Sequence, residues 1–462
     1  MTGLRIAHFS DTFLPRRDGV ITSIRTLAGA LAERGHESVL FAPGYPSRSP
    51  VGFPVVGLPS VPCGVADLRL ATWPRSRQVA RVAAEAPDVV HVHTPGPAGL
   101  LGVLAAAKLG LPLVQTYHTD LHAYLEAYKI PTTALRLIRA AYARRLAAPS
   151  PFDESDLLPA GTASAVGPGA FGPGAGRDGR TPARRRAALR VVRGAAGAWR
   201  SERRSATRCG LLDAANAAFF GGTDVVVVPT AAVLRRSALP VDPARVVQVP
   251  TGVRERPASA GARVAFRDRY GIPADAPLVL FVGRVNREKN VDALLAATAT
   301  LASSLPAVRV ALVGAVYEPR WLGALLRRHG VGDRVVTTGQ LPAGAVAEAY
   351  AAADVFAFPS LTDTQGLVLQ EAALAGLPVV LSDTVLHAHG PLAGAAVCAS
   401  GDGFAVAIAG LLTDPDLAAV TAAACRAAAL RHTPDAYGAA IEAVYHRARA
   451  GKHTSSPLRA IA

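Results

Sequence analysis

The chain has 462 residues, half of them hydrophobic, and a formal net charge of +15. This length suffices for two domains that each bury a core of their own. The four cysteines form no C-x-x-C pair, so neither a zinc site nor a disulfide framework is indicated, and reduced cytosol is the expected compartment. No basic-then-apolar signal peptide is recognised, and the most apolar window, 98–114, is interrupted by Lys108 and Gly110, which predicts helix, turn and strand in place of a membrane span.

The first half of the chain alternates apolar strands with helices. Residues 4–9 predict a strand, and a loop over 10–19 leads into a helix over 20–34. Further strands are expected at 38–42, 88–93, 113–117 and 224–228. Apolar strands alternating with helices are typical of a parallel sheet with helices on both faces.

One basic, low-complexity segment breaks this alternation. Residues 149–182 are dense in Pro, Gly, Ser and Ala and lack periodicity, which indicates disorder. Residues 177–208 hold eleven arginines against two acids, a local net charge of +9, which suits anionic surfaces. The segment is either a basic amphipathic surface helix, with Leu189, Val192 and Trp199 at helical spacing, or a solvated disordered insertion, and composition favours the second.

The alternation of strand and helix starts afresh in the second half. Strands are expected at 278–282, 308–313, 334–337, 355–358 and 379–381. Two doubly wound, Rossmann-like α/β sheets joined near 254–276 leave a cleft between them, and ligands of such sheets bind at the carboxyl ends of the strands. We expect an N-terminal domain over 1–255 with an insertion at 149–208, a C-terminal domain over 256–432, a helix over 433–450 and a tail over 451–462.

The stretch 359–378 combines a strand-to-helix loop with two acids. Such a loop offers backbone N–H groups at the helix start, where they can hold a phosphate. Asp363 lies just before that start, and Glu371 lies eight residues later, near the face of the first turn. This arrangement suits a ligand with phosphates at its centre and hydroxyls at both ends, such as a nucleotide sugar. Spacing alone leaves open an ordinary strand–loop–helix unit with a solvated Asp and Glu.

A second cluster of charges follows the first strand of the second domain. The run Val-Gly-Arg-Val-Asn-Arg-Glu-Lys-Asn places Arg284 and Lys289 in one loop. Arg284 can bind two phosphate oxygens at once, and Lys289 adds a point charge. Opposite the helix start at Gly366, the two cations would neutralise a diphosphate leaving group.

These two motifs resemble the acidic-x7-acidic signature and the Gly-Arg…Glu-Lys-Asn phosphate motif of the family-4 retaining glycosyltransferases, which have the GT-B fold. The resemblance implies that Asp363 grips the hydroxyls of the donor sugar, that Glu371 holds the ribose, and that amides at Gly366 and Leu367 meet the diphosphate. The first acid is usually Glu in this family and is one methylene shorter here. The run Asp-Thr-Gln-Gly-Leu resembles a subset that includes diacylglycerol glucosyltransferases.

The first domain carries two matching positions. Gly19, in the loop after the first strand, permits close backbone approach to a phosphate and matches the family's Gly in that loop. His118, at the carboxyl end of a strand, lies in a run that resembles the Tyr-His-Thr element of the lipid-directed glucosyltransferases. The resemblance implies that His118 contacts the donor sugar, and Asp120 and Asp18 are the candidates to meet the acceptor.

Two further patterns bear on metal binding. His91 and His93 share a strand face, but the sequence places no third ligand, so packing histidines are favoured over a metal site. Asp414 and Asp416 look like the metal-binding Asp-x-Asp of another glycosyltransferase class, yet they precede a helix, which is ordinary capping chemistry. We expect no obligatory metal and no cofactor beyond the donor substrate.

The sequence therefore predicts a retaining hexosyltransferase that moves a hexose from a nucleoside diphosphate sugar to an acceptor, with a membrane lipid such as diacylglycerol as the candidate. No carboxylate is a clear nucleophile, so the resemblance favours front-face attack. Arg284, Lys289 and the amides at the helix start would stabilise the leaving diphosphate. The alternatives are a GDP-mannose-dependent α-mannosyltransferase acting on an inositol lipid or glycan, and a catalytically silent nucleotide-sugar-binding protein. The expected location is the cytoplasm, with peripheral attachment to an anionic membrane surface through 177–208, and no nucleic-acid partner is expected.

Overall fold

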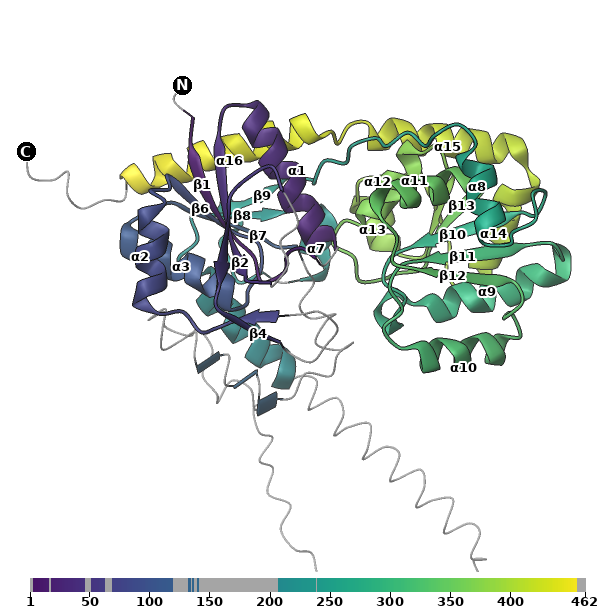
Figure 1. Cartoon of the computed structure of the whole chain (residues 1–462), viewed down its shortest axis with the longest axis horizontal. Coiled ribbons are helices and arrows are strands. Elements are labelled where there is room, and N and C mark those ends of the chain that lie inside the picture. Colours follow the sequence, from purple (N-terminus) through teal and green to yellow (C-terminus); the bar gives the residue numbers. More distant parts are fainter. Residues whose placement is uncertain are drawn as a thin grey trace, which may run out of the picture.

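Two α/β domains lie side by side in the computed structural model, and the last helix of the described chain lies along the N-terminal domain (Figure 1). The structure describes residues 3–15, 18–45, 51–62, 69–118, 132–133, 135–136, 139–140, 207–237 and 239–454. The basic segment 177–208 lies almost wholly outside these residues, as do Asp120 and the tail beyond 454.

The N-terminal domain is built on a seven-stranded parallel sheet with the order β3-β2-β1-β6-β7-β8-β9. Its central strands are buried throughout because their residues are apolar on both faces, as expected for a parallel sheet covered on both sides. The strands are β1 (Arg5–Phe9), β2 (Glu37–Pro43), β3 (Val55–Leu58), β6 (Val89–Val92), β7 (Leu113–Thr116), β8 (Val225–Val228) and β9 (Val246–Gln248). A short antiparallel pair, β4 (Ser60–Pro62) and β5 (Arg69–Ala71), lies beside them.

Helices cover both faces of this sheet. They are α1 (Gly19–Glu33), α2 (Ser76–Ala84), α3 (Pro97–Leu109), a helix that includes residues 207–220, α7 (Ala231–Arg236) and the 3-10 turn η2 (Pro243–Arg245). Asp18 begins α1 by accepting a hydrogen bond from the backbone N–H of Ile21, and Gly110 ends α3 in the left-handed conformation.

The C-terminal domain is built on a six-stranded parallel sheet with the order β12-β11-β10-β13-β14-β15. Its strands are β10 (Leu278–Val282), β11 (Arg309–Val313), β12 (Val335–Gly339), β13 (Val355–Phe358), β14 (Val379–Leu381) and β15 (Val397–Cys398). Its helices are α8 (Ala262–Arg269), η3 (Arg287–Lys289), α9 (Val291–Ser304), α10 (Pro319–His329), α11 (Ala343–Ala352), α12 (Leu367–Leu374), α13 (Thr384–His389), α14 (Asp402–Thr413) and α15 (Pro415–Ala429). The expectation of two doubly wound sheets is confirmed.

Helix α16 (Pro434–Thr454) returns to the first domain and packs along α1, as the yellow ribbon in Figure 1 shows. Tyr437, Ile441 and Tyr445 are buried in one apolar cluster with residues of β1 and α1. Gly438 permits this close packing, because a Cβ atom there would lie 2.7 Å from the Cβ of Ala30. The last helix therefore belongs to the core of the first domain.

The two connections between the domains run next to each other. The N–H of Val253 donates to the carbonyl of His432 over 3.1 Å, and a Cβ atom on Gly252 would lie 2.3 Å from the carbonyl oxygen of Thr433.

Within the described residues, no individual helix combines the length and apolar character needed to cross a membrane. One bent pair of helices, 402–413 with 415–451, meets these two criteria by length and composition alone.

Candidate active site

The loops after β10 and β13 carry the two predicted ligand-binding motifs, and they meet at the carboxyl edge of the C-terminal sheet. These strands are neighbours in the sheet, so their loops emerge side by side. Lys289 Nζ lies 2.8 and 2.9 Å from the two carboxylate oxygens of Asp363. The side-chain amide of Asn290 donates to the carbonyl of Pro359 over 3.1 Å and fastens one loop to the other. The fold thus brings the predicted phosphate-binding cation and the predicted sugar-binding acid into contact.

Glu288 contacts both predicted phosphate-binding cations, a role that no sequence motif predicted. Its side chain is only 2% exposed. Both of its carboxylate oxygens lie 3.1 Å from Nη2 of Arg284, and one lies 3.3 Å from Nζ of Lys289. The spacing of four residues between Arg284 and Glu288 was the signal that could have revealed this contact.

The pair formed by Lys289 and Asp363 stays ionised over a wide pH range. Burial by itself would raise the pKa of Asp363, but the charge of Lys289 and hydrogen bonds from Lys289 and Ser360 outweigh it, so this pKa is lowered. Burial would likewise lower the pKa of Lys289, but the charges of Asp363 and Glu288 raise it. Both groups therefore carry their charges at neutral pH.

The start of α12 faces the start of α1 from the other domain. Gly366 precedes α12 with φ of 69°, and a Cβ there would lie 2.9 Å from a methyl carbon of Leu369, so this position favours glycine. A Cβ atom added to Gly19 would lie 3.8 Å from Cδ1 of Leu367. The first N–H groups of a helix have no intrahelical acceptor and attract anions. Two such helix starts meet here, one from each domain.

Glu371 lies further along α12, away from the pair of Lys289 and Asp363. It accepts a hydrogen bond of 3.0 Å from the hydroxyl of Tyr350, and Arg256 Nη1 is 4.0 Å from its other carboxylate oxygen. Burial raises the pKa of Glu371, opposed by the charge of Arg256 and the bond from Tyr350. The two predicted acids are thus held in separate environments, as two ends of one elongated ligand would require.

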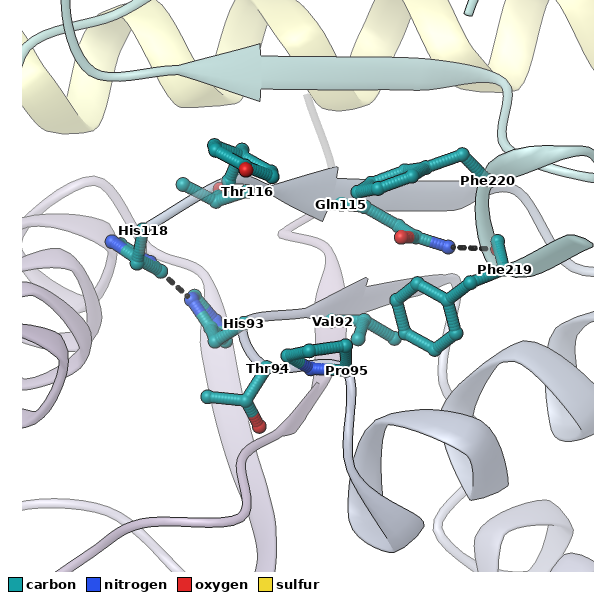
Figure 2. Close-up of a pocket in the computed structure, with 10 residues that line it drawn as sticks. Val92, His93, Thr94, Pro95, Gln115, Thr116, His118, Phe219 and Phe220 are labelled. Carbon is teal, nitrogen blue, oxygen red and sulfur yellow. Dashed lines mark hydrogen bonds between the residues drawn. The ribbon is translucent and has the colours of Figure 1, made fainter. Parts of the chain in front are cut away.

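His118 comes from the N-terminal domain and lies next to the loop of Asp363. The hydroxyl of Thr364 donates to the carbonyl oxygen of His118 over 2.7 Å. The His118 ring points toward that of His93, with its Nε2 3.1 Å from Nδ1 of His93 (Figure 2). Both rings line a pocket between the ends of β6 and β7, whose other side is formed by Phe219 and Phe220.

Arg236 of α7 holds the Asp363 loop from the opposite domain. Its Nη1 donates to the backbone carbonyl of Asp363 over 2.8 Å, and its Nη2 pairs with the carboxylate of Asp383. The hydroxyl of Thr230 donates to the carbonyl of Thr364 over 2.5 Å. No sequence pattern singled out these residues, because contacts between two domains leave no local signature.

Comparison with known proteins identifies the family of this chain. Residues 17–166 match the model described as Glycosyltransferase Family 4, and residues 263–426 match the model described as Glycosyl transferases group 1. The chain belongs to the family-4 glycosyltransferases. The resemblance inferred from the motifs around Arg284 and Asp363 is confirmed.

Three relatives of this glycosyltransferase differ in how much of it they match. A D-inositol 3-phosphate glycosyltransferase of Xylanimonas cellulosilytica is 36% identical over 42% of the chain, which spans about half (47%) of that relative. A GDP-mannose-dependent alpha-mannosyltransferase of Mycobacterium tuberculosis is 28% identical over 83% of the chain and 80% of the relative. An alpha-monoglucosyldiacylglycerol synthase of Streptococcus pneumoniae is 25% identical over 82% of the chain and 70% of the relative.

Solved structures place the glycosyltransferase in the GT-B fold. A sucrose-phosphate synthase from Thermosynechococcus elongatus is similar over 97% of this chain and 100% of its own, with a TM-score of 0.62 and 21% identity. Anabaena Alr3699/HepE, solved in complex with UDP and glucose, is similar over 96% of this chain and 99% of its own, with a TM-score of 0.64 and 15% identity.

Other predicted positions have structural roles in the glycosyltransferase. The carboxylate of Asp18 accepts from the N–H of Ile21 and from the hydroxyl of Thr12, so it caps α1. Asp414 caps α15 by accepting from the N–H groups of Asp416 and Leu417, which confirms the capping interpretation of that pair. Asp120, the other acceptor candidate, lies outside the described residues.

His8 joins His91 and His93 in a buried cluster that no sequence pattern predicted. It pairs with His91 across β1 and β6, and one ring nitrogen from each of the three rings lies within 4.8 Å of the others. Every ring nitrogen of the three makes a hydrogen bond: His8 to His93 and Ser38, His93 to His8 and His118, and His91 to Tyr445 and Thr116. These bonds satisfy the rings as neutral imidazoles, and the expectation that the enzyme needs no metal stays a prediction.

Proposed function

We propose that this glycosyltransferase moves a hexose from a nucleoside diphosphate sugar to an acceptor with retention of configuration. The observation that carries the proposal is the ion pair of Lys289 and Asp363 beside the start of α12, which faces Gly19 across the domain boundary. A diphosphate at this point would meet two helix starts together with Lys289 and Arg284, while Asp363 would reach the attached sugar.

The proposed residues divide the chemistry into binding and charge stabilisation. Glu371 would accept hydrogen bonds from the ribose hydroxyls, and His118 would contact the hexose. As the glycosidic bond breaks, negative charge grows on the diphosphate, and Arg284, Lys289 and the amides at Gly366 and Leu367 would stabilise it. The acceptor would attack from the same face, with the leaving diphosphate taking its proton. Because two fixed cations supply the positive charge, we expect transfer without an obligatory metal.

A membrane lipid of the diacylglycerol type is the proposed acceptor. The name of the Streptococcus pneumoniae relative indicates a glucosylated diacylglycerol as its product, and that relative aligns over 82% of this chain. Peripheral attachment to an anionic leaflet is part of the proposal, because eleven arginines in 177–208 give that segment a net charge of +9.

A second candidate is α-mannosyl transfer from GDP-mannose to an inositol lipid or glycan. The Mycobacterium tuberculosis relative named for GDP-mannose and α-mannosyl transfer has the higher identity, 28%, over a similar share of the chain.

Donor and acceptor assays separate these candidates. The purified enzyme would be incubated with UDP-glucose or GDP-mannose and with diacylglycerol or phosphatidylinositol in mixed micelles, with and without EDTA. Mass spectrometry would identify the product, and NMR would give its anomeric configuration. We expect α-glucosyl transfer to diacylglycerol that resists EDTA. An inverted product or an EDTA-sensitive rate would contradict the mechanism, and mannosyl transfer alone would select the second candidate.

A further inference from the structure

A row of buried polar side chains crosses the N-terminal sheet and ends at His118. Ser38 and His8 lie on β2 and β1, and His93 and His118 follow the ends of β6 and β7; these four strands are consecutive in the sheet. Side chains two residues apart on a strand share a face, and Ile6, two residues before His8, is apolar and packs beneath α1 and α16. The polar row therefore runs obliquely across a face that is otherwise mostly apolar, from Ser38, which pairs with Ile6 in the sheet, to His118 beyond the carboxyl end of β7.

Hydrogen bonds join these four side chains end to end. Ser38 Oγ lies 3.3 Å from Nε2 of His8, and Nδ1 of His8 lies 3.0 Å from Nε2 of His93. Nδ1 of His93 then lies 3.1 Å from Nε2 of His118. A neutral imidazole donates from one nitrogen and accepts at the other, so fixing the direction of one bond fixes the direction of all.

The hydroxyl of Ser38 decides the direction. Its bond to His8 is the one hydrogen bond that Ser38 Oγ makes within the part of the chain that the structure describes. If Ser38 accepted this bond, its own O–H proton would be buried without an acceptor, which costs more than an unused oxygen lone pair. Ser38 therefore donates to His8, His8 donates to His93, and His93 donates to Nε2 of His118.

We propose that Ser38, His8 and His93 are positioning residues that hold His118 as the neutral tautomer protonated at Nδ1, so that it presents a hydrogen-bond donor to an oxygen of the donor hexose. This inference rests on the proposed function, in which His118 contacts the sugar. Nδ1 of His118 makes no hydrogen bond to any residue that the structure describes, so it is available to a ligand. Because Nδ1–H of His118 can donate a hydrogen bond but cannot accept one, it would favour a hexose whose oxygen at this point accepts a hydrogen bond.

Burial keeps the three hydrogen-bonded histidine rings neutral. Burial lowers the pKa of His8 to about 3 and that of His118 to about 4, and it lowers the pKa of His93 well below its usual value. A protonated ring would have two donors and would break one bond of the chain. A metal ion held by His8, His91 and His93 would also displace bonds of the chain, and it is the competing use of these rings.

The test is the tautomer of His118, observed by long-range 1H–15N NMR of the full chain labelled at histidine. The His118 signals are assigned by their loss in His118→Ala. We expect a proton on Nδ1 and a bare, hydrogen-bonded Nε2. Ser38→Ala removes the terminal donor and should reduce the preference for this tautomer by about tenfold, the effect of one ordinary hydrogen bond. Thr116→Val is the matched control: it removes a buried hydroxyl that bonds His91 and should leave His118 unchanged.

A pair of variants at His93 links the tautomer to turnover. His93→Asn places an amide N–H where Nδ1 was and should keep the His118 tautomer and most of kcat. His93→Phe removes the donor and should lower kcat about tenfold with unchanged affinity for the nucleoside diphosphate. A proton on Nε2 of His118 in the wild type, or an unchanged His118 tautomer in Ser38→Ala, would overturn the proposal. Equal kcat for the two His93 variants would also overturn it, as would a stoichiometric metal whose removal changes the histidine spectra. Absence of transfer with every donor would refute the proposed function and leave the NMR result to stand alone.

Discussion

Lys289 and Asp363 bind each other: Nζ lies 2.8 and 2.9 Å from the two carboxylate oxygens. The cation proposed for the diphosphate and the acid proposed for the sugar therefore neutralise one another. In the proposed binding mode, the diphosphate of the donor would contact Lys289 and its sugar would contact Asp363.

The first prediction concerns the two cations. Arg284→Ala and Lys289→Ala should each lower kcat by about 10²-fold, the scale for loss of one preorganised charge stabiliser. Lys289→Ala should also lower the free energy of unfolding at pH 7 by about 3 kcal/mol, because it leaves Asp363 and Glu288 close together without their shared cation. Urea unfolding and transfer assays measure the two effects. Near-normal kcat in both variants would contradict the assigned role.

The second prediction separates the two acids. Glu371→Gln should weaken binding of the nucleoside diphosphate alone, because the ribose contact does not need the sugar. Asp363→Asn should keep or tighten that binding, since Lys289 loses one of its two counter-ions, and should reduce transfer. Isothermal titration and kinetics distinguish the variants, and the same pattern of defects in both would show that the roles are wrongly assigned.

The third prediction concerns His118. His118→Ala should keep the affinity for the nucleoside diphosphate and lower kcat by about 10²-fold, because the ring is proposed to contact the hexose and not the base or phosphates. Because the pKa of His118 is lowered to about 4, its protonation should not limit kcat above about pH 5. Loss of nucleotide binding in the variant would place the ring elsewhere in the site.

The fourth prediction is a loss of stability in mild acid. Burial holds the folded pKa of His8 near 3 and that of His118 near 4, below the ordinary 6.5. Below about pH 6.5 the unfolded chain binds protons that the folded chain does not, so the free energy of unfolding should fall by up to about 1.4 kcal/mol per pH unit for each such ring. The loss should continue down to the folded pKa. Urea titrations between pH 7.5 and 5 measure the slope, and His8→Gln, which cannot titrate, should make it shallower.

The fifth prediction concerns the basic segment 177–208. Arginines near an anionic leaflet contribute roughly 1 kcal/mol each, so the full chain should sediment with phosphatidylglycerol vesicles at low salt and dissociate at high salt. Deletion of 150–206 should abolish sedimentation. A variant with the arginines of this segment changed to Gln keeps the length and should also fail to bind. Equal binding by all three proteins would exclude the segment as the anchor.

Local sequence patterns predicted the strands and the two motif loops closely. The helix expected over 20–34 is observed as Gly19–Glu33, and the strand expected over 278–282 is Leu278–Val282. Short strands such as β3, β9 and β15 were not predicted, because two to four residues with partial burial give no clear periodicity. The capping role of Asp414 was predicted correctly because a helix cap involves only neighbouring residues.

Two doubly wound sheets, the family and the charged loops could all be predicted from the sequence, because buried strands, helix starts and cation–acid motifs each depend on short stretches of chain. Which of these stretches meet became clear from the folded structure. Gly19 faces Leu367, Arg236 holds the loop of Asp363, and His8 extends the contact of His93 with His118 into a chain that reaches Ser38. Strand order and domain closure set these contacts, and both depend on packing between segments far apart in the chain, which no local periodicity records.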